Sequence, residues 1–253
     1  MLDSNTLTYA PFIDPRRSRN SAFDVGQSGR LLVGTENSGK KYIIKHCYPH
    51  NATNEYVACW LAKKLGVPAP DACLLTPNKA FDSKYAVAIE FLDLKPFDKA
   101  ATPHPEDLIA QFALSSLIAQ DDAIQLNVAD GHIVSYDFSE AFYMDNMNGL
   151  LALLATGSEC DNDTAIEVIR RHVTSFRRHL SFMDFDVPGL AREFNLDNLQ
   201  MREGMIAVGK KSLQITEEDV YALSEELENL YPFEIAVFYE ECIFSIQRHM
   251  RKF

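Results

Sequence analysis

Short apolar runs separated by turn residues mark the first third of the chain. Two of them, Leu31-Leu32-Val33 and Tyr42-Ile43-Ile44, flank the turn-forming segment Glu36-Asn37-Ser38-Gly39. This pattern predicts a β-hairpin. Two further strands are expected near residues 72–76 and 85–91. One helix is expected between these pairs, starting at residues 51–54 and continuing to residue 65. Apolar residues recur in it at helical spacing, and Gly66 follows the last of them.

The pattern becomes mainly helical after Leu94-Lys95-Pro96, which we interpret as a linker. Helices are expected over residues 106–119, 164–180, 216–230 and 232–250, with one short hairpin turning at Ala129-Asp130-Gly131. This outline is α+β, with a β-rich first lobe and a mainly helical second lobe. The expected boundaries are an N-terminal arm over residues 1–20, a first lobe over 21–95 and a second lobe over 96–253.

Composition and charge narrow the class of protein. The 253 residues are enough for one large domain or two lobes, and 47% of them are hydrophobic and 24% charged, as in ordinary globular proteins. The formal net charge of −12 argues against direct binding to nucleic acid, which depends on basic surface. It leaves room for a small basic cleft that holds nucleotide phosphates.

Cysteine usage and the absence of long apolar segments bear on location. The five cysteines are scattered without a CxxC pair, which is typical of free thiols in a reducing compartment. No uninterrupted apolar run is long enough for a membrane span, and the first residues lack the apolar core of a signal peptide. We therefore expect a cytoplasmic protein without a membrane span.

Lys45 and Glu55 form the first part of a candidate catalytic set. Lys45 ends an apolar strand, and Glu55 lies ten residues later near the start of the expected helix. In phosphoryl transfer from ATP, a strand lysine contacts the phosphates and a helix glutamate holds that lysine. Taken alone, the two residues are better explained as a lysine at a strand edge and a glutamate on a solvated helix face.

Asp122, Asn127 and Asp137 form the more specific part. Asp122 and Asn127 are five positions apart, and Asp137 follows the strand-like run Ile133-Val134-Ser135-Tyr136. In kinase-type sites a catalytic aspartate orients the acceptor hydroxyl, while an asparagine about five residues later and a second aspartate bind Mg²⁺. Carboxylate and amide oxygens are the ligands that Mg²⁺ prefers. We assign Asp122 as the catalytic residue and Asn127 with Asp137 as metal ligands.

The phosphate-binding loop has a weaker signal. The segment Gly26-Gln27-Ser28-Gly29 precedes the first apolar strand, and the backbone N–H groups of Ser28 and Gly29 are candidates for binding phosphates. It matches neither G-x-G-x-x-G nor the Walker A pattern, so a plain Ser/Gly turn explains it equally well.

Residues 24–143 resemble the HipA-like kinases, bacterial relatives of the protein-kinase and phosphatidylinositol-kinase fold. The resemblance rests on Gln27-Ser28-Gly29, the strand ending in Lys45, the Asn54-Glu55-Tyr56 helix start with its Leu65-Gly66-Val67-Pro68-Ala69-Pro70 ending, and the run ending in Asp137-Phe138. It implies a two-lobed protein-kinase-like fold and the cofactors ATP and Mg²⁺. It also implies that Glu90, Phe91 and Leu92 form the hinge that contacts adenine.

One departure from the family keeps alternatives open. Family members usually carry a histidine shortly after the catalytic aspartate, and Ile124 occupies that position here. The first hypothesis is a serine/threonine kinase that phosphorylates a protein hydroxyl and itself, with Ser28 as the first self-acceptor to test. The others are a nucleotide-binding pseudokinase with a regulatory or scaffold role and a kinase for a small-molecule hydroxyl.

Overall fold

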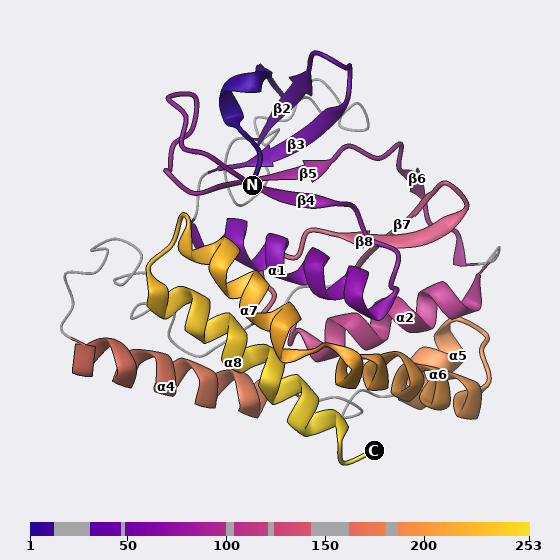
Figure 1. The fold of residues 1–253 in the computed structure, drawn as a ribbon. Helices are drawn as coiled ribbons and strands as arrows, with labels where there is room; N and C mark the ends of the chain where they lie inside the picture. Colours follow the sequence, from indigo (N-terminus) through magenta and orange to yellow (C-terminus); the bar gives the residue numbers. More distant parts are fainter. Residues whose placement is uncertain (13–30, 47–48, 100–103, 121–123, 143–161, 181–186) are drawn as a thin grey trace.

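A computed structural model describes residues 1–12, 31–46, 49–99, 104–120, 124–142, 162–180 and 187–253. The described residues form two lobes, with a β-sheet above and a group of helices below (Figure 1). This arrangement confirms the predicted α+β fold, with a β-rich N-terminal lobe and a mainly helical C-terminal lobe. None of the helices in the described ranges is long and apolar enough to cross a membrane. The cytoplasmic location stays a prediction.

The N-terminal lobe is built on an antiparallel sheet with the strand order β1-β2-β3-β5-β4. Its strands are β1 (Leu7–Pro11), β2 (Leu31–Glu36), β3 (Lys41–Lys45), β4 (Ala72–Leu75) and β5 (Ala86–Glu90). The predicted hairpin is confirmed, since Leu32 pairs with Ile44 and Val33 with Ile43. Gly39 closes its turn at a φ of +89°, a conformation that glycine adopts without steric cost.

Near its start the chain forms a strand that the sequence analysis did not predict. Leu7–Pro11 pairs antiparallel with β2 and forms an edge strand of the sheet. The sequence signal for this strand is weak because only Leu7 is buried and Pro11 stands at its end. Pro is tolerated at that position because an edge strand leaves one side unpaired. Residues 7–11 therefore belong to the N-terminal sheet, and the expected domain boundaries stay a prediction.

The two faces of the sheet pack against different partners. Along β5, Val87 and Ile89 belong to the large core that includes α1 (Pro49–Leu65). Ala86 and Ala88 point the other way, into a smaller apolar cluster with Ile44. This alternation follows from the two-residue period of a strand. Both faces of the central strands are thus covered, and α1 lies between the sheet and the helices of the second lobe (Figure 1).

A three-stranded sheet connects the lobes, in the order β6-β7-β8. Its strands are β6 (Lys95–Pro96), β7 (Gln125–Ala129) and β8 (His132–Tyr136). The expected linker at Lys95-Pro96 is thus a short strand that pairs with β7. Asp130 and Gly131 turn the chain between β7 and β8 with φ values of +50° and +86°, as a tight two-residue hairpin requires. This turn fixes the register that places the residues before Asp137.

Helices make up the rest of the second lobe. They are α2 (Pro105–Leu117), α4 (Asn162–His179), α5 (Val187–Glu193), α6 (Asn198–Lys210), α7 (Glu217–Glu228) and α8 (Phe233–Met250), with the short 3₁₀ helix η4 (Lys211–Gln214) after α6. Another 3₁₀ helix, η1 (Ser4–Thr6), precedes β1 in the N-terminal lobe. The predicted helices at 106–119, 164–180, 216–230 and 232–250 are confirmed within a few residues. Thr216 and Asp219 start α7 with reciprocal capping bonds.

Candidate functional site

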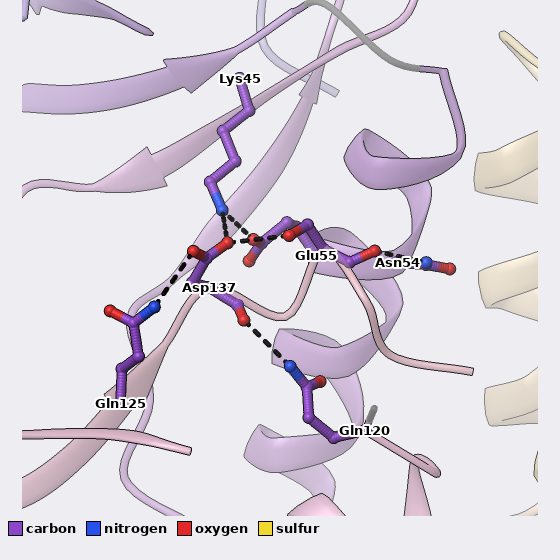
Figure 2. A network of polar contacts seen from close by, with 7 residues as sticks. Lys45, Asn54, Glu55, Gln120, Gln125 and Asp137 are labelled. Atoms are coloured by element: carbon purple, nitrogen blue, oxygen red, sulfur yellow. Dashed lines mark hydrogen bonds and ion pairs between the residues drawn. The ribbon is translucent and has the colours of Figure 1, made fainter. Parts of the chain in front are cut away.

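Lys45, Glu55 and Asp137 meet between the two lobes. Lys45 is the last residue of β3, and Glu55 lies in the second turn of α1. The Lys45 ammonium donates to the Glu55 carboxylate and, at 2.5 Å, to Oδ1 of Asp137. Figure 2 shows the lysine side chain reaching down from its strand to the two carboxylates. Three residues that the sequence assigned to one site therefore lie in contact, although Asp137 is 92 positions from Lys45.

The exposure of the three side chains decreases from Asp137 through Lys45 to Glu55. The Asp137 side chain is 32% exposed, Lys45 is 12% exposed and Glu55 is 1% exposed. A carboxylate buried to this degree is costly without a cationic partner, and Lys45 supplies it. Glu55 is therefore no solvated surface residue. Asp137 is the member that solvent or a ligand reaches most easily.

The charges of the three groups depend on one another. Burial alone lowers the pKa of Lys45, but the carboxylates of Glu55 and Asp137 outweigh it and hold that pKa above its usual value. Burial raises the pKa of Glu55, and the Lys45 ammonium opposes the rise. For Asp137, burial also acts upward, but the hydrogen bonds and charge of Lys45 and a bond from Ser139 keep the pKa low. The site thus holds a protonated lysine beside an ionised aspartate.

Asp137 adopts an uncommon backbone conformation. It follows β8 directly and has a φ of +69°, in the left-handed region that few residues other than glycine occupy. Ser139 Oγ donates to its Oδ1 at 2.9 Å, and Gln120 Nε2 donates to its backbone carbonyl at 3.2 Å. These bonds hold the carboxylate toward Lys45 as the chain turns away from the strand. Unusual backbone angles held by surrounding contacts are frequent at functional sites.

Gln125, which the sequence analysis did not single out, faces Asp137. Its Nε2 lies 3.5 Å from Asp137 Oδ2, and it pairs with Tyr136, the residue before Asp137. Asn127 lies two positions farther along β7, opposite Val134. Its side chain is buried and donates to the carbonyl of Gln125 at 3.3 Å. The structure gives Asn127 no direct bond to Asp137, and its role as a metal ligand stays a prediction.

Three predicted site residues lie outside the described ranges. They are Ser28 and Gly29 of the candidate phosphate loop and Asp122, the candidate catalytic residue. Their roles also stay predictions. The described residues beside them are Leu31, which starts β2, and Gln120 and Ile124, which flank residues 121–123.

The expected adenine hinge lies at the end of β5. Glu90 is the last residue of that strand, and the chain continues through Phe91 and Leu92 toward β6 in the second sheet. Glu90, Phe91 and Leu92 thus belong to the connection between the lobes, as the hypothesis requires. The backbone N–H of Phe91 donates to the carbonyl of Lys41 at 3.0 Å, and its ring is 42% exposed. Contact with adenine stays a prediction.

The chemistry of the donor groups fits Mg²⁺ with a phosphate ligand. Asp137 is ionised, its Oδ2 is not engaged by Lys45, and the amide of Gln125 lies beside it. Mg²⁺ prefers such oxygen ligands and keeps several waters, so few protein groups suffice. Lys45 supplies a positive charge next to the same carboxylate. No group of three His, Cys, Asp or Glu side chains suited to a metal occurs among the described residues.

Comparisons with known proteins identify the fold. A Helicobacter pylori proinflammatory kinase, CtkA, is similar with a TM-score of 0.51 and 12% sequence identity, over 96% of each chain. The HipA–HipB toxin–antitoxin complex of Shewanella oneidensis MR-1 with operator DNA matches with a TM-score of 0.42 and 10% identity, over 90% of this chain and 62% of that one. A fragment of LepB from Legionella pneumophila gives 0.37 and 13%, over 85% and 46%.

Similarity is found in structure and not in sequence. No protein-family model matches the chain, and no curated protein sequence matches it. The similarity to CtkA extends over nearly the whole of both chains, so it concerns both lobes. At this level of identity it establishes the fold alone. The similarity to CtkA confirms the two-lobed, kinase-like fold that the resemblance to HipA-like kinases implied.

Proposed function

We propose that the protein is an Mg-ATP-dependent phosphotransferase, a HipA-like serine/threonine kinase able to phosphorylate itself. The observation that carries the proposal is the convergence of Lys45, Glu55 and Asp137 between the lobes of a kinase-like fold. A lysine on a strand, a glutamate on the following helix and an aspartate after a hairpin are the groups that phosphoryl transfer from ATP needs. Here they occur in that order and in contact.

Each residue has a distinct part in this proposal. Glu55, fully buried, holds the Lys45 ammonium where it neutralises negative charge on the nucleotide phosphates. Asp137 is the carboxylate that would hold Mg²⁺, with Asn127 as the predicted second ligand and Gln125 as the amide that lies closer. When bound, Mg-ATP supplies the phosphoryl group and the positive charge that stabilises its transfer. Glu90, Phe91 and Leu92 would contact the adenine, and Ser28 and Gly29 the phosphates.

The acceptor side of the reaction depends on Asp122. A carboxylate within hydrogen-bond reach of the acceptor hydroxyl orients that hydroxyl and accepts its proton as transfer proceeds. We assign that role to Asp122 because it lies five positions before Asn127, and a protein hydroxyl is the proposed acceptor. Ser28 is the self-acceptor to test first. A small-molecule hydroxyl would use the same residues, and the two acceptors are distinguished by which product carries the label.

A nucleotide-binding pseudokinase is the second candidate. Two observations favour it: Ile124 takes the place where related kinases carry a histidine, and the amide that contacts the Asp137 carboxylate belongs to Gln125 instead of Asn127. A longer side chain at the metal would retain nucleotide binding while slowing transfer. This candidate predicts ATP binding without phosphate incorporation into any acceptor.

Transfer of labelled phosphate separates the candidates. Purified protein is incubated with γ-³²P-ATP and Mg²⁺, alone and with a general protein acceptor, beside the variants Asp137→Ala and Asp122→Asn. The proposal predicts incorporation by the wild type, and a loss of at least about a hundredfold in both variants. Ser28→Ala removes the self-label if Ser28 is the acceptor. Unchanged incorporation in Asp137→Ala, with the variant folded by circular dichroism, would refute the assignment.

A further inference from the structure

Asn54, directly before Glu55 on α1, makes two buried hydrogen bonds. Its Nδ2 donates to the backbone carbonyl of Ser139 at 2.8 Å, and its Oδ1 accepts from the Tyr239 hydroxyl at 2.6 Å. Asn54 is 2% exposed and Tyr239 is 1% exposed. A buried polar group needs such partners, and a satisfied pair of bonds in a dry environment fixes geometry strongly. Asn54 therefore connects helix α1 to two other parts of the molecule.

The two partners of Asn54 come from distant segments. Ser139 lies two residues after Asp137, and Tyr239 lies on α8, 185 positions from Asn54. The chain of contacts thus runs from the C-terminal helix through α1 to the segment that follows Asp137. Figure 2 shows Asn54 and Glu55 side by side on α1, next to the contacts of Asp137.

Two consecutive residues of α1 hold the backbone that follows Asp137. Glu55 accepts a hydrogen bond from the backbone of Phe138, and Asn54 donates to the carbonyl of Ser139. The hydroxyl of Ser139 in turn donates to the Asp137 carboxylate at 2.9 Å. A shift of Ser139 would therefore move both the backbone and a direct partner of the carboxylate.

We propose that Asn54 and Tyr239 are positioning residues that fix the Asp137 carboxylate relative to Lys45. Neither is hydrogen-bonded to Lys45 or Asp137, so both act through Ser139. Asp137 needs such support because its backbone, at a φ of +69°, has left the strand and is not held by the sheet. Positioning within a fraction of an ångström decides whether a metal ligand serves catalysis. This inference rests on the proposed function of the Lys45–Asp137 site.

Two tyrosine variants give a matched comparison. Tyr239→Phe removes one hydroxyl and leaves the ring in the core. Tyr56→Phe is the control, because Tyr56 is also buried, lies on α1 two positions after Asn54, and donates to Glu226 at 2.6 Å. Both variants lose one hydrogen bond of the same length, but only Tyr239 is bonded to Asn54.

The first measurement does not require nucleotide. Amide hydrogen exchange of the segment around residues 137–142 is followed by mass spectrometry in the wild type and both variants. We expect Tyr239→Phe to speed exchange in this segment about fivefold, the effect of weakening one buried hydrogen bond. Tyr56→Phe should leave the segment at the wild-type rate. Equal exchange in the wild type and Tyr239→Phe would overturn the inference, whether or not the protein binds ATP.

The second measurement concerns the metal. ATP is titrated into each protein by calorimetry, with Mg²⁺ and with EDTA. We expect Tyr239→Phe to weaken Mg-dependent ATP binding about fivefold and to leave binding in EDTA unchanged, since only the metal ligand is displaced. If Tyr239→Phe exchanges faster than the wild type but the wild type binds no ATP, the positioning of Asp137 is supported and the proposed function is refuted. Faster exchange with wild-type Mg-ATP affinity would overturn the positioning role.

A second pair of variants tests whether Tyr239 acts through Asn54. Asn54→Ala removes both bonds, and it should speed exchange at residues 137–142 more than Tyr239→Phe does. The double variant should then match Asn54→Ala alone, because Asn54→Ala already removes the bond through which the hydroxyl acts on this segment. Residues that act through a shared contact show such non-additivity. Multiplied effects in the double variant would show that Tyr239 acts by another route and overturn the inference.

Discussion

At the scale of single residues, the site depends on how a buried charge is compensated. Glu55 lies in the core, and its carboxylate shares the charge of the Lys45 ammonium with Asp137, whose side chain is about one-third exposed. Removing the lysine would strand a carboxylate in an apolar environment, whereas removing the whole pair would not. Stability and chemistry can therefore be separated by mutation at this site.

We predict that Lys45→Met and the double change Lys45→Met/Glu55→Met differ in stability and agree in activity. The single variant should lose about 3 kcal/mol in the free energy of unfolding, because Glu55 is left unpaired. The double variant should recover most of that loss, since two apolar side chains of similar volume replace the pair. Neither should bind Mg-ATP as the wild type does. Urea denaturation and calorimetric titration measure the two properties.

The surface pair of Lys40 and Glu90 is the control for this prediction. Its atoms are 3.8 Å apart and both side chains are at least one-third exposed. Lys40→Met should therefore cost less than about 1 kcal/mol. A double variant at Lys45 and Glu55 that is less stable than Lys45→Met alone would contradict the account of the buried pair.

The hairpin in the sequence also predicts the position of Gln125, which the sequence analysis did not include in the site. The two-residue turn at Asp130-Gly131 sets the pairing of β7 with β8, and counting back from it places Gln125 opposite Tyr136. Gln125 could thus have been predicted beside Asp137 from the hairpin alone. Lys45, Glu55 and Asp137 were predictable because each lies near an end of a regular element. Lys45 ends β3, Glu55 lies near the start of α1, and Asp137 follows β8. Asn54 and Tyr239 could not be paired, since their contact depends on the packing of helices 185 positions apart.

At the scale of elements, α1 is held from several directions. Residues 51–59 are all buried, since the sheet covers one side of the helix and the C-terminal helices cover another. The predicted start was at residues 51–54, and the helix begins two residues earlier, at Pro49. Proline fits the first turn of a helix because its missing N–H is not needed there. A helix buried on nearly all sides shows little periodicity, which explains the poor boundary.

Helix α6 was not predicted as a separate helix. Only three of its residues are buried, Met201, Met205 and Gly209, and a second glycine, Gly204, lies in its middle. Glycine lowers helix propensity by about 1 kcal/mol relative to alanine, so the sequence signal is weak. The reason for Gly204 is tertiary: a Cβ built there would lie 2.8 Å from Cγ2 of Ile109 on α2. Close packing of two helices decides this residue.

We predict that Gly204→Ala destabilises the protein and that a change at Ile109 reverses the sign. In the wild type the added methyl group overlaps a branched side chain, at a cost of about 1–3 kcal/mol before the better helix propensity is subtracted. In an Ile109→Ala background the overlap is gone, so the same change should stabilise by up to about 1 kcal/mol. Thermal denaturation of the four proteins measures both steps. The same effect in both backgrounds would show that Ile109 is not the reason for glycine.

At the scale of the whole molecule, one apolar core extends through both lobes. It contains Val87 and Ile89 of the sheet, Leu61 of α1, and Phe176 and Phe238 of the helical lobe. Gln111 of α2 adds a polar link, since its Nε2 donates to the carbonyls of Pro68 and Ile133 at 2.6 and 2.9 Å. The fold as a whole was predictable because the two lobes differ in pattern. The continuity of the core was not, because it depends on contacts between distant segments.

We predict that the two lobes unfold in one transition. The chain has one tryptophan, Trp60, and it lies on α1, so its fluorescence reports on the N-terminal lobe. Far-UV circular dichroism reports mainly on the helices of the second lobe. Because a shared core makes the lobes cooperative, the two signals should have the same midpoint in urea. An earlier transition of the fluorescence signal would show that the N-terminal lobe unfolds independently.

The central claim is that Lys45, Glu55 and Asp137 form an Mg-ATP site. It is tested most directly by calorimetric titration of ATP into the wild type and Asp137→Asn, each with Mg²⁺ and with EDTA. The account predicts that Mg²⁺ strengthens ATP binding to the wild type, and that Asp137→Asn loses this gain, by about tenfold or more, while binding in EDTA is retained or improved. Equal strengthening by Mg²⁺ in both proteins, or no ATP binding by the wild type, would contradict it.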